Sequence, residues 1–420
     1  MKRNYYVVGL IMLTFFVISF LTNIIGPLIP EIIEDFELSL TLVALLPFAF
    51  FIAYGVTSIP AGMLVERYTA KRVTIGAFAL ACFGAGLLAM FPDYLVAIAS
   101  LFLIGTGMAM LQVALHPVLR VAGGEEHFAF NSVLGQLFFG LASFLSPLVY
   151  SYLVLNLGAG GDQNLLLDVL GRLVPPDLPW ISLYWIFAAV CLLMIAILSA
   201  SPIPSIELTE EEQVGAVKTH LDLLKRPLVI LYFIGIFCYV GVEQGVANWM
   251  SEFLSSYHGF DPQTEGASAV SLFWGLMTAG TLLGLLALKL MDSRHVLIGF
   301  TCATILCFSL GLFGSGEMAR YALPAVGFFI SVMWSVIFSL ALNSVSEHHG
   351  SFSGILITGI LGGAVVPLVV GWIGDLAGLR TGWLFLYLAM GYILSIGFWA
   401  DPLISNKTIS AQKSMSRDLT

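Results

Sequence analysis

The stretch LVILYFIGIFCYVGVEQGVANWMSEFLSSY, residues Leu228–Tyr257, contains no Lys or Arg, and the nearest ones on either side are Arg226 and Lys289. As a helix it would be about 45 Å long, more than the ~30 Å hydrocarbon core of a bilayer. Glu243 lies near its middle. An unpaired ionised carboxylate at the membrane midplane costs roughly 2.5 kcal/mol or more, so chains keep one mainly to move ions or polar solutes, or to brace a bundle. The stretch therefore predicts a membrane helix with a functional acid.

The composition extends this prediction to the whole chain. Its 420 residues are 59% hydrophobic and only 10% charged, with a mean hydropathy of +0.96. Lipid cannot satisfy open backbone groups, and no alternating barrel pattern is visible, so we expect an all-α membrane protein. The first apolar stretch is not followed by a cleavage signature, which predicts that it is retained. The twelve predicted transmembrane helices are Tyr5–Ile33, Leu38–Val65, Val73–Phe91, Tyr94–Val121, Phe128–Leu157, Trp180–Ala200, Leu228–Tyr257, Ala267–Leu290, Val296–Phe313, Ala319–Val345, Ser353–Leu376 and Gly382–Ala400.

The basic residues predict the orientation. With a cytoplasmic N-terminus and twelve spans, only Arg172, Arg320 and Arg380 of the seventeen Lys and Arg residues fall outside. This distribution obeys the positive-inside rule. We expect an integral multi-pass protein of a bacterial inner membrane, with both termini cytoplasmic.

A charged interior segment, Ser201–Pro227, separates the sixth and seventh spans. It predicts a first six-helix bundle over residues 1–201, a cytoplasmic linker over 202–227, and a second bundle with a cytoplasmic tail over 228–420. Duplicated transporters have this organisation and bind their substrates between the halves, near the midplane. The predicted outside loop Gly158–Pro179 carries leucines at amphipathic spacing, which leaves a role as a lid open.

Several other classes of function are disfavoured. All five cysteines lie within apolar spans and form no CxxC pair, which favours packing over disulfides. The spans contain no HExxH, GxSxG or paired Asp, so we expect no enzyme and no cofactor. No nucleic-acid footprint is present. We expect a monomer in a lipid bilayer, with no firm metal site apart from a possible Na+ near Glu243.

One loop carries a specific motif. Between the second and third predicted spans the chain reads AGMLVERYTAKRV, with the candidate gating residues Gly62, Glu66, Arg67, Lys71 and Arg72. Snorkelling would explain the basic residues, but not the spacing of Gly62 and Glu66. The segment resembles the cytoplasmic G-x-L-x-D-R-x-G-R-K signature of the major facilitator superfamily, with Glu66 for the Asp and Ala70 for the second Gly. A carboxylate and a basic cluster at opposing helix ends predict a charge lock that opens and closes as two halves rock.

Polar side chains inside the spans predict the substrate class. Amides form paired hydrogen bonds to adjacent hydroxyls and indoles cover C–H faces, so this set suits a neutral polyhydroxylated solute. No Lys or Arg lies deep in a span, which disfavours anionic substrates. Interhelical hydrogen bonds by the amides, and a satisfied interior role for His116, are the alternatives. The candidate substrate-binding residues are Asn23, Gln112, His116, Asn131, Gln136, Gln244, Asn248, Trp249 and Trp334.

Four segments are similar to the fucose:proton symporter family, which includes L-fucose permeases and glucose/galactose transporters. They are FCYVGVEQGVANW, WSVIFSLALNSV, GILGGAVVPLVVGWIGDLAG and LQVALHPVLRVAGGEEHFAFN. The resemblance covers nearly the whole chain and implies the major facilitator fold, with two pseudo-symmetric six-helix halves. It places Trp249 and Trp334 at aromatic pocket positions, and Asn23 and Asn131 at amide positions.

The chain departs from this family at two acids. Fucose permeases carry an Asp in the first span and a Glu in the fourth, and the matching positions here are Gly26 and Gln112. Neither can titrate, so the family's coupling cannot be transferred residue by residue. Glu243 becomes the leading candidate for ion coupling partly by elimination.

Three active roles for Glu243 are open. It could carry a proton, supply one anionic oxygen to Na+, or accept hydrogen bonds from a sugar without coupling; a structural bridge to a neighbouring helix is the fourth interpretation. The predicted function is import of a neutral monosaccharide, a hexose or deoxyhexose, coupled to Na+ or H+ by alternating access. The alternatives are an exporter of small molecules or drugs, an uncoupled sugar uniporter, and a sugar sensor that does not transport.

Overall fold

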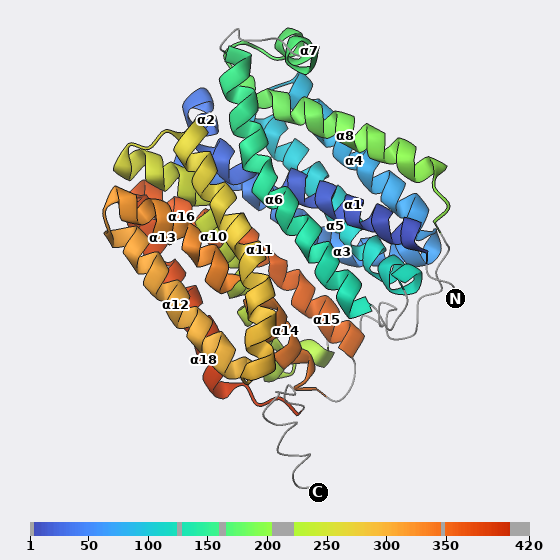
Figure 1. Ribbon diagram of the computed structural model, residues 1–420, viewed down its shortest axis with the longest axis vertical. Helices are drawn as coiled ribbons and strands as arrows, with labels where there is room; N and C mark the ends of the chain where they lie inside the picture. The colour runs from blue at the N-terminus through green and yellow to red at the C-terminus, as the bar shows by residue number, and fades with distance from the viewer. Residues whose placement is uncertain (1–3, 124–127, 159–164, 204–221, 346–348, 404–420) are drawn as a thin grey trace, which may run out of the picture.

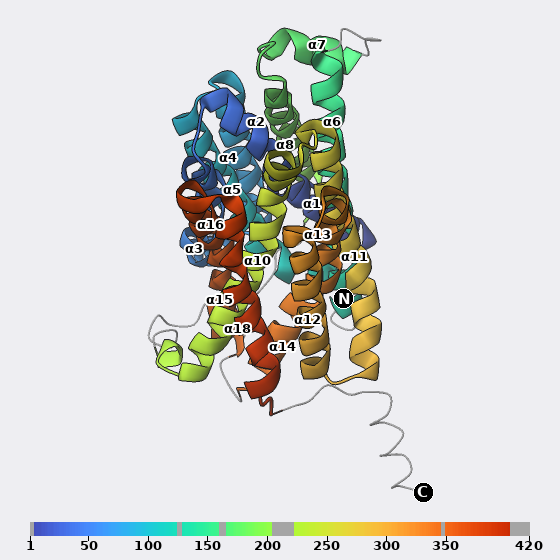
Figure 2. The same cartoon turned by 90° about the vertical axis from the view of Figure 1, so that its left-hand side faces the viewer.

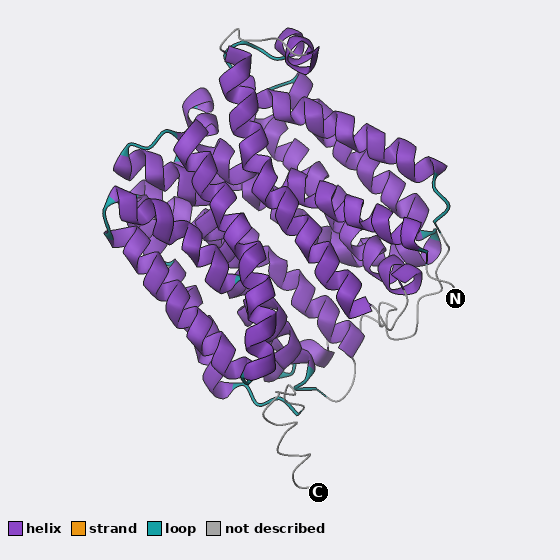
Figure 3. Ribbon diagram, viewed as in Figure 1, coloured by secondary structure: helices purple, strands orange, loops and turns teal. Residues whose placement is uncertain are grey.

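The computed structural model of the chain describes residues 4–123, 128–158, 165–203, 222–345 and 349–403. Within these ranges the regular structure is helical (Figure 3). The helices of the first half are α1 (Tyr5–Thr22), α2 (Ile25–Phe36), α3 (Leu40–Arg67), α4 (Ala70–Met90), α5 (Tyr94–Gly123), α6 (Phe128–Gly158), α7 (Leu165–Leu173), η2 (Pro179–Ile181) and α8 (Ser182–Ala200). Those of the second half are α10 (Pro227–His258), η3 (Pro262–Gly266), α11 (Ala267–Leu290), α12 (Ser293–Phe313), α13 (Gly316–Ile330), α14 (Met333–Leu342), α15 (His349–Thr358), η4 (Gly359–Leu361), α16 (Gly362–Ala377), α17 (Leu379–Leu384) and α18 (Leu386–Trp399).

Twelve helical segments of the described chain are long and apolar enough to cross a membrane, which confirms the predicted count. The first of them runs over Tyr5–Phe36 and combines α1 with α2. The short α7 lies in the predicted outside loop, with Leu167 and Leu170 buried. Most of the predicted linker, residues 204–221, lies outside the described residues, so the domain boundaries stay a prediction.

The helices form two groups that follow the order of the chain (Figure 1). The blue-to-green helices α1 to α8 lie together, and the yellow-to-red helices α10 to α18 form the other group. The turned view keeps the same division (Figure 2). The main contacts between the groups join α3 to α16, α6 to α11 and α2 to α10.

Several spans are interrupted near their middles. The chain between α1 and α2 leaves helical geometry at Asn23 and Ile24. Pro27 explains this break, because a proline ring clashes with the carbonyl four residues earlier, here that of Asn23. The tenth span breaks at Ser331 and Val332, where the Ser331 hydroxyl donates to the Phe328 carbonyl (2.7 Å). These interruptions lie inside the first and tenth spans, which still run as single membrane-crossing segments over Tyr5–Phe36 and Gly316–Leu342.

Small residues let the halves approach closely. Gly26 in α2 lies against the α10 backbone, and a Cβ there would sit 2.5 Å from the Ala247 carbonyl oxygen. Gly371 in α16 lies against α3, and its Cβ would be 2.7 Å from the Leu40 carbonyl oxygen. Glycine at such contacts permits backbone-to-backbone packing that any side chain would prevent.

Candidate functional site

Glu243 is a half-buried residue of α10, which continues unbroken through the bundle for 32 residues. Its two carboxylate oxygens each accept one hydrogen bond. The Tyr239 hydroxyl donates to Oε2 (2.7 Å), and the Gln244 amide donates to Oε1 (3.0 Å). Tyr239 lies four residues earlier on the same helix, where i and i+4 side chains meet. The carboxylate is therefore held by donors from its own helix rather than by a basic partner.

Aromatic rings extend this site toward α14. The rings of Tyr239 and Trp334 lie 6.0 Å apart between centroids, and Trp334 stacks on Phe338 at 6.0 Å. Trp334 is the second residue of α14, directly after the break in the tenth span. Trp334, which the sequence predicted to line the pocket, therefore contacts Tyr239, and Tyr239 in turn donates a hydrogen bond to Glu243.

The side chain of Gln244 is buried where three helices meet. A Cβ on Gly363 of α16 would lie 3.1 Å from Gln244 Cγ and 3.2 Å from Phe51 Cγ of α3. Gly363 thus brings α16 against both α10 and the first half. The Glu243 site lies beside the interface between the halves, where a rocking motion would act on it.

The indole of Trp249 has a structural position. Trp249 is fully buried, and its Nε1 donates to the Pro367 carbonyl of α16 (3.1 Å). Trp383 makes a similar bond from α17 to the Gly245 carbonyl (3.0 Å). Both indoles therefore satisfy carbonyls inside the second half. The Trp249 N–H is therefore not available to a sugar, and the aromatic pocket position that the resemblance gives Trp249 stays a prediction.

Asn23 lies in a neutral polar network of the first half. Its Nδ2 donates to Ser143 Oγ of α6 (2.8 Å), and Ser143 Oγ lies 2.6 Å from Ser19 Oγ of α1. Ser19 also donates to the Phe139 carbonyl (2.6 Å). The network joins α1 to α6 at the position where α1 ends. Interhelical hydrogen bonding of this kind is the alternative to substrate binding that the sequence analysis gives for the amides within the spans.

The remaining predicted substrate residues are more dispersed. Asn131 is buried at the start of α6, against the end of α5: a Cβ on Gly123 would be 3.1 Å from its Cγ. Gln112 is half-buried in α5, and Gln136 is exposed on α6. His116 belongs to α5, but its side chain lies outside the described residues. These four residues are not brought together with Glu243 by any described contact.

The predicted charge lock is described only in part. Gly62 is buried in α3, while the side chain of Glu66 lies outside the described residues. Arg67 lies over the Tyr68 ring, 5.6 Å from its centroid. Arg72 is exposed on α4, and its backbone N–H is capped by the Thr69 hydroxyl.

Lys71 shows what one basic residue of the motif does. Its Nζ donates to the carbonyls of Ser199 (2.9 Å) and Ser201 (2.7 Å), at the end of α8. A cation at a helix C-terminus is favourable because it satisfies the last carbonyls. This contact stays within the first half.

The opposite end of the molecule is closed by contacts between the halves. We call it the α2 end; it holds the end of α2, the start of α3, η3 and the turn between α16 and α17. The carboxylate of Asp375 on α16 accepts hydrogen bonds from the backbone N–H groups of Leu40 and Thr41, both at 2.8 Å, and from the Thr41 hydroxyl. An anion at a helix N-terminus is favoured by the unsatisfied N–H groups and the helix dipole.

Two further bonds reinforce this closure. Gln263 of η3 donates to Glu31 of α2 (2.5 Å), and Ser271 of α11 donates to the Phe144 carbonyl of α6 (2.7 Å). At the other end, which holds the start of α1 and the end of α18, Lys71 bonds within the first half and Arg294 bonds to the Ala400 carbonyl within the second. The halves are thus held together at the α2 end.

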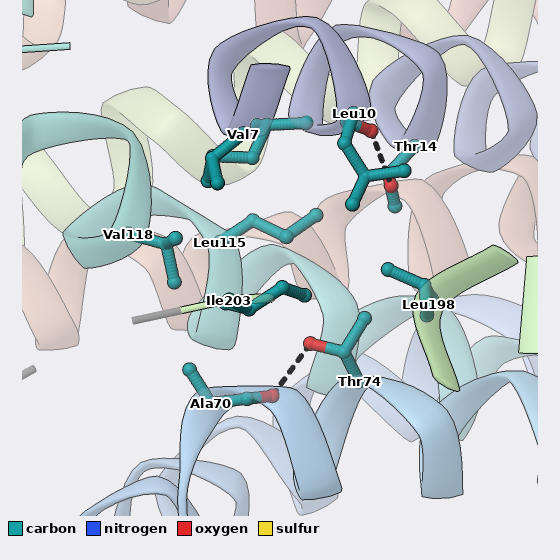
Figure 4. A pocket seen from close by; sticks show the side chains of 10 residues that line it. Val7, Leu10, Thr14, Ala70, Thr74, Leu115, Val118, Leu198 and Ile203 are labelled. Atoms are coloured by element: carbon teal, nitrogen blue, oxygen red, sulfur yellow. Dashed lines mark hydrogen bonds between the residues drawn. The ribbon is translucent and has the colours of Figure 1, made fainter. Parts of the chain in front are cut away.

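A small cavity of about 10 Å³ lies inside the first half, among α1, α4, α5 and α8 (Figure 4). Its walls are mostly aliphatic, and its two hydroxyls are turned to their own helices: Thr14 donates to Leu10 O (2.9 Å) and Thr74 to Ala70 O (2.7 Å). Such a space has room for about one water molecule. It offers nothing to a sugar and is not the candidate site.

No group of three or more His, Cys, Asp or Glu residues in the described part of the chain is arranged to hold a metal ion. Sequence reasoning found Glu243, Gln244 and Trp334 but missed Tyr239 and Asp375. The signal for Tyr239 was its i−4 spacing from Glu243. Asp375 had no local signal, because its partners lie 334 and 335 residues away.

The comparisons with known proteins agree with this architecture. The profile of the Major Facilitator Superfamily matches residues 11–360. The chain is 30% identical to a glucose/galactose transporter of Brucella abortus over 94% of both chains, and 25% identical to an L-fucose-proton symporter of Escherichia coli over 87% of this chain and 86% of the other.

Among solved structures, the outward conformation of the transporter FucP has a TM-score of 0.66 at 23% identity, covering 94% of this chain and 98% of that one. A bacterial homologue of the lysosomal transporter Spinster, in an inward-facing conformation, has a TM-score of 0.75 at 16% identity, covering 94% and 97%. These likenesses show the shared fold of twelve spans in two halves. The chain therefore belongs to the Major Facilitator Superfamily.

Proposed function

We propose that the chain imports a neutral monosaccharide, a hexose or deoxyhexose, by proton-coupled alternating access. The observation that carries the proposal is the Glu243 carboxylate, which lies beside the interface of the halves with a hydroxyl and an amide as its hydrogen-bond donors. The relatives support the substrate class, since they include glucose/galactose transporters and L-fucose-proton symporters.

The donors of Glu243 favour H+ over Na+. A sodium ion requires several oxygen ligands with their lone pairs directed at it, whereas both oxygens of Glu243 face hydrogens of Tyr239 and Gln244. A proton needs only one free lone pair on the carboxylate. Uptake driven by Na+ would overturn this choice. Tyr239 and Gln244 would then have to turn away, so that the Glu243 oxygens could bind the ion.

The contacts at the α2 end support a state closed on that side. The positive-inside prediction places the α2 end outside and both termini in the cytoplasm of a bacterial cell, so the described state would open inward. We infer that residues 1–201 and 228–420 rock as two units, joined by the 202–227 linker. The described contacts of Glu243 come from its own chain, and we propose a monomer as the functional unit.

The test is uptake into proteoliposomes of a labelled hexose and deoxyhexose panel under separately imposed H+ and Na+ gradients. We expect at least one sugar to accumulate under an inward H+ gradient, and the Na+ gradient alone to have no effect. Accumulation driven only by Na+ would replace the proton by sodium. Equilibration without accumulation would support the uniporter, and exchange of hydrophobic cations instead of sugars would support the exporter.

A further inference from the structure

Six buried polar atoms in the described part of the second half lack a hydrogen-bond partner, and two of them are side-chain N–H donors that lie well inside the bundle. They are Nδ2 of Asn248 on α10 and Nε1 of Trp274 on α11. The side chains are only 5% and 4% exposed, so bulk water does not satisfy them. Buried polar groups without partners are rare in native proteins and point to a bound molecule. The Glu243 site uses neither donor.

The packing of α10 on α11 brings the two side chains to the same side. Ser251 of α10 lies against Gly266 at the start of α11, where a Cβ would be 3.3 Å from Ser251 Cβ. Asn248 precedes Ser251 by about one turn, and Trp274 follows Gly266 by about two turns on the same face. Both residues therefore lie deeper in the bundle than this contact, on the facing sides of two antiparallel helices.

The direction of the side chains brings them closer still. Side chains on an α-helix incline toward its N-terminus. Because α10 and α11 run in opposite directions, Asn248 inclines away from the α2 end and Trp274 inclines toward it. Their Cα atoms differ in depth by about 7.5 Å at 1.5 Å per residue, and this inclination makes the difference between the two donors smaller.

Elements of the first half complete the surroundings. Gly26 lies against Asn248, with a Cβ there 3.2 Å from Asn248 Cα. Phe144 of α6 lies against Gly275, the residue after Trp274, where a Cβ would be 2.8 Å from Phe144 Cδ2. The two donors thus lie at the interface of the halves, beside the break between α1 and α2.

We propose that Asn248 Nδ2 and Trp274 Nε1 donate hydrogen bonds to two oxygens of the transported sugar. This inference rests on the proposed function and adds a subsite to it. An indole N–H is a donor only, so Trp274 selects a sugar oxygen with a free lone pair. Trp249 and Trp383 cannot take this role, because their N–H groups already bind the Pro367 and Gly245 carbonyls.

The test is the binding of a labelled hexose to purified full-length protein, with the hexose chosen as the one that binds the wild type most tightly. Trp274→Phe keeps an aromatic ring and removes the N–H, and we expect Kd to rise about tenfold. Asn248→Leu keeps the branched arrangement of four side-chain heavy atoms but removes the donor, and we expect a similar rise. Trp185→Phe is the matched control: its Nε1 is also buried without a partner, but on α8 of the first half. We expect that control to bind like the wild type.

Deoxy analogues locate the bond. One deoxy sugar should bind the wild type about tenfold more weakly than its parent, and Trp274→Phe should bind that sugar and its parent equally. If the wild type binds sugar and both Trp274→Phe and Asn248→Leu bind it equally well, the subsite is refuted and the proposed function stands. If the wild type binds no sugar, the proposed function is refuted first, and the subsite falls with it.

Discussion

The two halves each hold a polar cluster near the contact between α2 and α10, and the clusters differ in how their hydrogen bonds are used. In the first half, Asn23 is neutral and bound to Ser143, which in turn bonds with Ser19. In the second half, Glu243 is acidic, and Asn248 on the same helix keeps a buried donor without a partner. A satisfied neutral network braces helices, whereas an acid and free donors are suited to ions and ligands.

This difference is consistent with the absence from the first half of the two acids that fucose permeases carry in their first and fourth spans. The resemblance to fucose permeases led us to expect acids where Gly26 and Gln112 stand. The structure gives Gly26 another role, because its missing side chain lets α2 contact α10. Both halves contribute to the closure, since Asp375 of the second half bonds Leu40 and Thr41 of the first, and we propose that the coupling acid and the free donors belong to the second half alone.

The largest effect is expected where the first half closes on the second. Gly26→Ala places a methyl group 2.5 Å from the Ala247 carbonyl oxygen, so α2 and α10 must separate. Overpacking of this kind costs about 1–3 kcal/mol, so we expect sugar uptake to fall roughly 10- to 100-fold. Initial uptake rates in proteoliposomes measure this. Gly9→Ala is the control, since nothing lies within 4 Å of its Cβ position; equal rates for both variants would remove the closure role.

An effect of comparable size is expected from Tyr239→Phe, which removes one of the two donors of Glu243 while keeping the ring beside Trp334. Hydrogen bonds to charged groups contribute about 1.5–3 kcal/mol, so we expect proton-driven uptake to fall at least about tenfold. Exchange at equal sugar concentrations should change less, because it needs no net proton movement. A variant that loses exchange and uptake in parallel would show that Tyr239 serves the sugar rather than the acid.

The Asp375 contact should have a smaller effect. Asp375→Asn removes the charge from the N-terminus of α3, which contributes about 0.3–1 kcal/mol. We expect the population open at the α2 end to rise about threefold, measured by double electron–electron resonance between spin labels on α3 and α16. Glu252→Gln is the control, since it removes a carboxylate that bonds Ser256 within α10. An unchanged distance distribution for Asp375→Asn would assign the closure to packing alone.

The smallest effect on transport is expected from Asn23→Ala. Loss of its bond to Ser143 should lower stability by about 1 kcal/mol, visible as a lower melting temperature in detergent. Sugar affinity should stay the same, because the network is a brace. A large loss of sugar affinity without loss of stability would show that Asn23 binds the substrate, and would contradict the assignment of the first-half network to bracing.

Sequence patterns predicted the spans well because apolar length is a local property. The chain positions of Glu243, Gln244 and Trp334 could be read in the same way. The helix breaks at Asn23 and Ser331 were not predicted. The first could have been expected from Pro27, whereas the only feature at the second is the Ser331 hydroxyl, which bonds a backbone carbonyl. Trp249 was placed by resemblance in the pocket, but its partner Pro367 lies 118 residues away. Contacts between spans are not encoded in any single span, so the sequence could not assign the indoles.

The central claim is that Glu243 couples sugar movement to protons. The most direct measurement compares wild type and Glu243→Gln in proteoliposomes, with labelled sugar under an inward proton gradient and in exchange at equal sugar concentrations. We expect the wild type to accumulate sugar up to about tenfold per pH unit for one proton. The variant should exchange sugar without accumulating it. Accumulation by Glu243→Gln at the wild-type level would contradict the account.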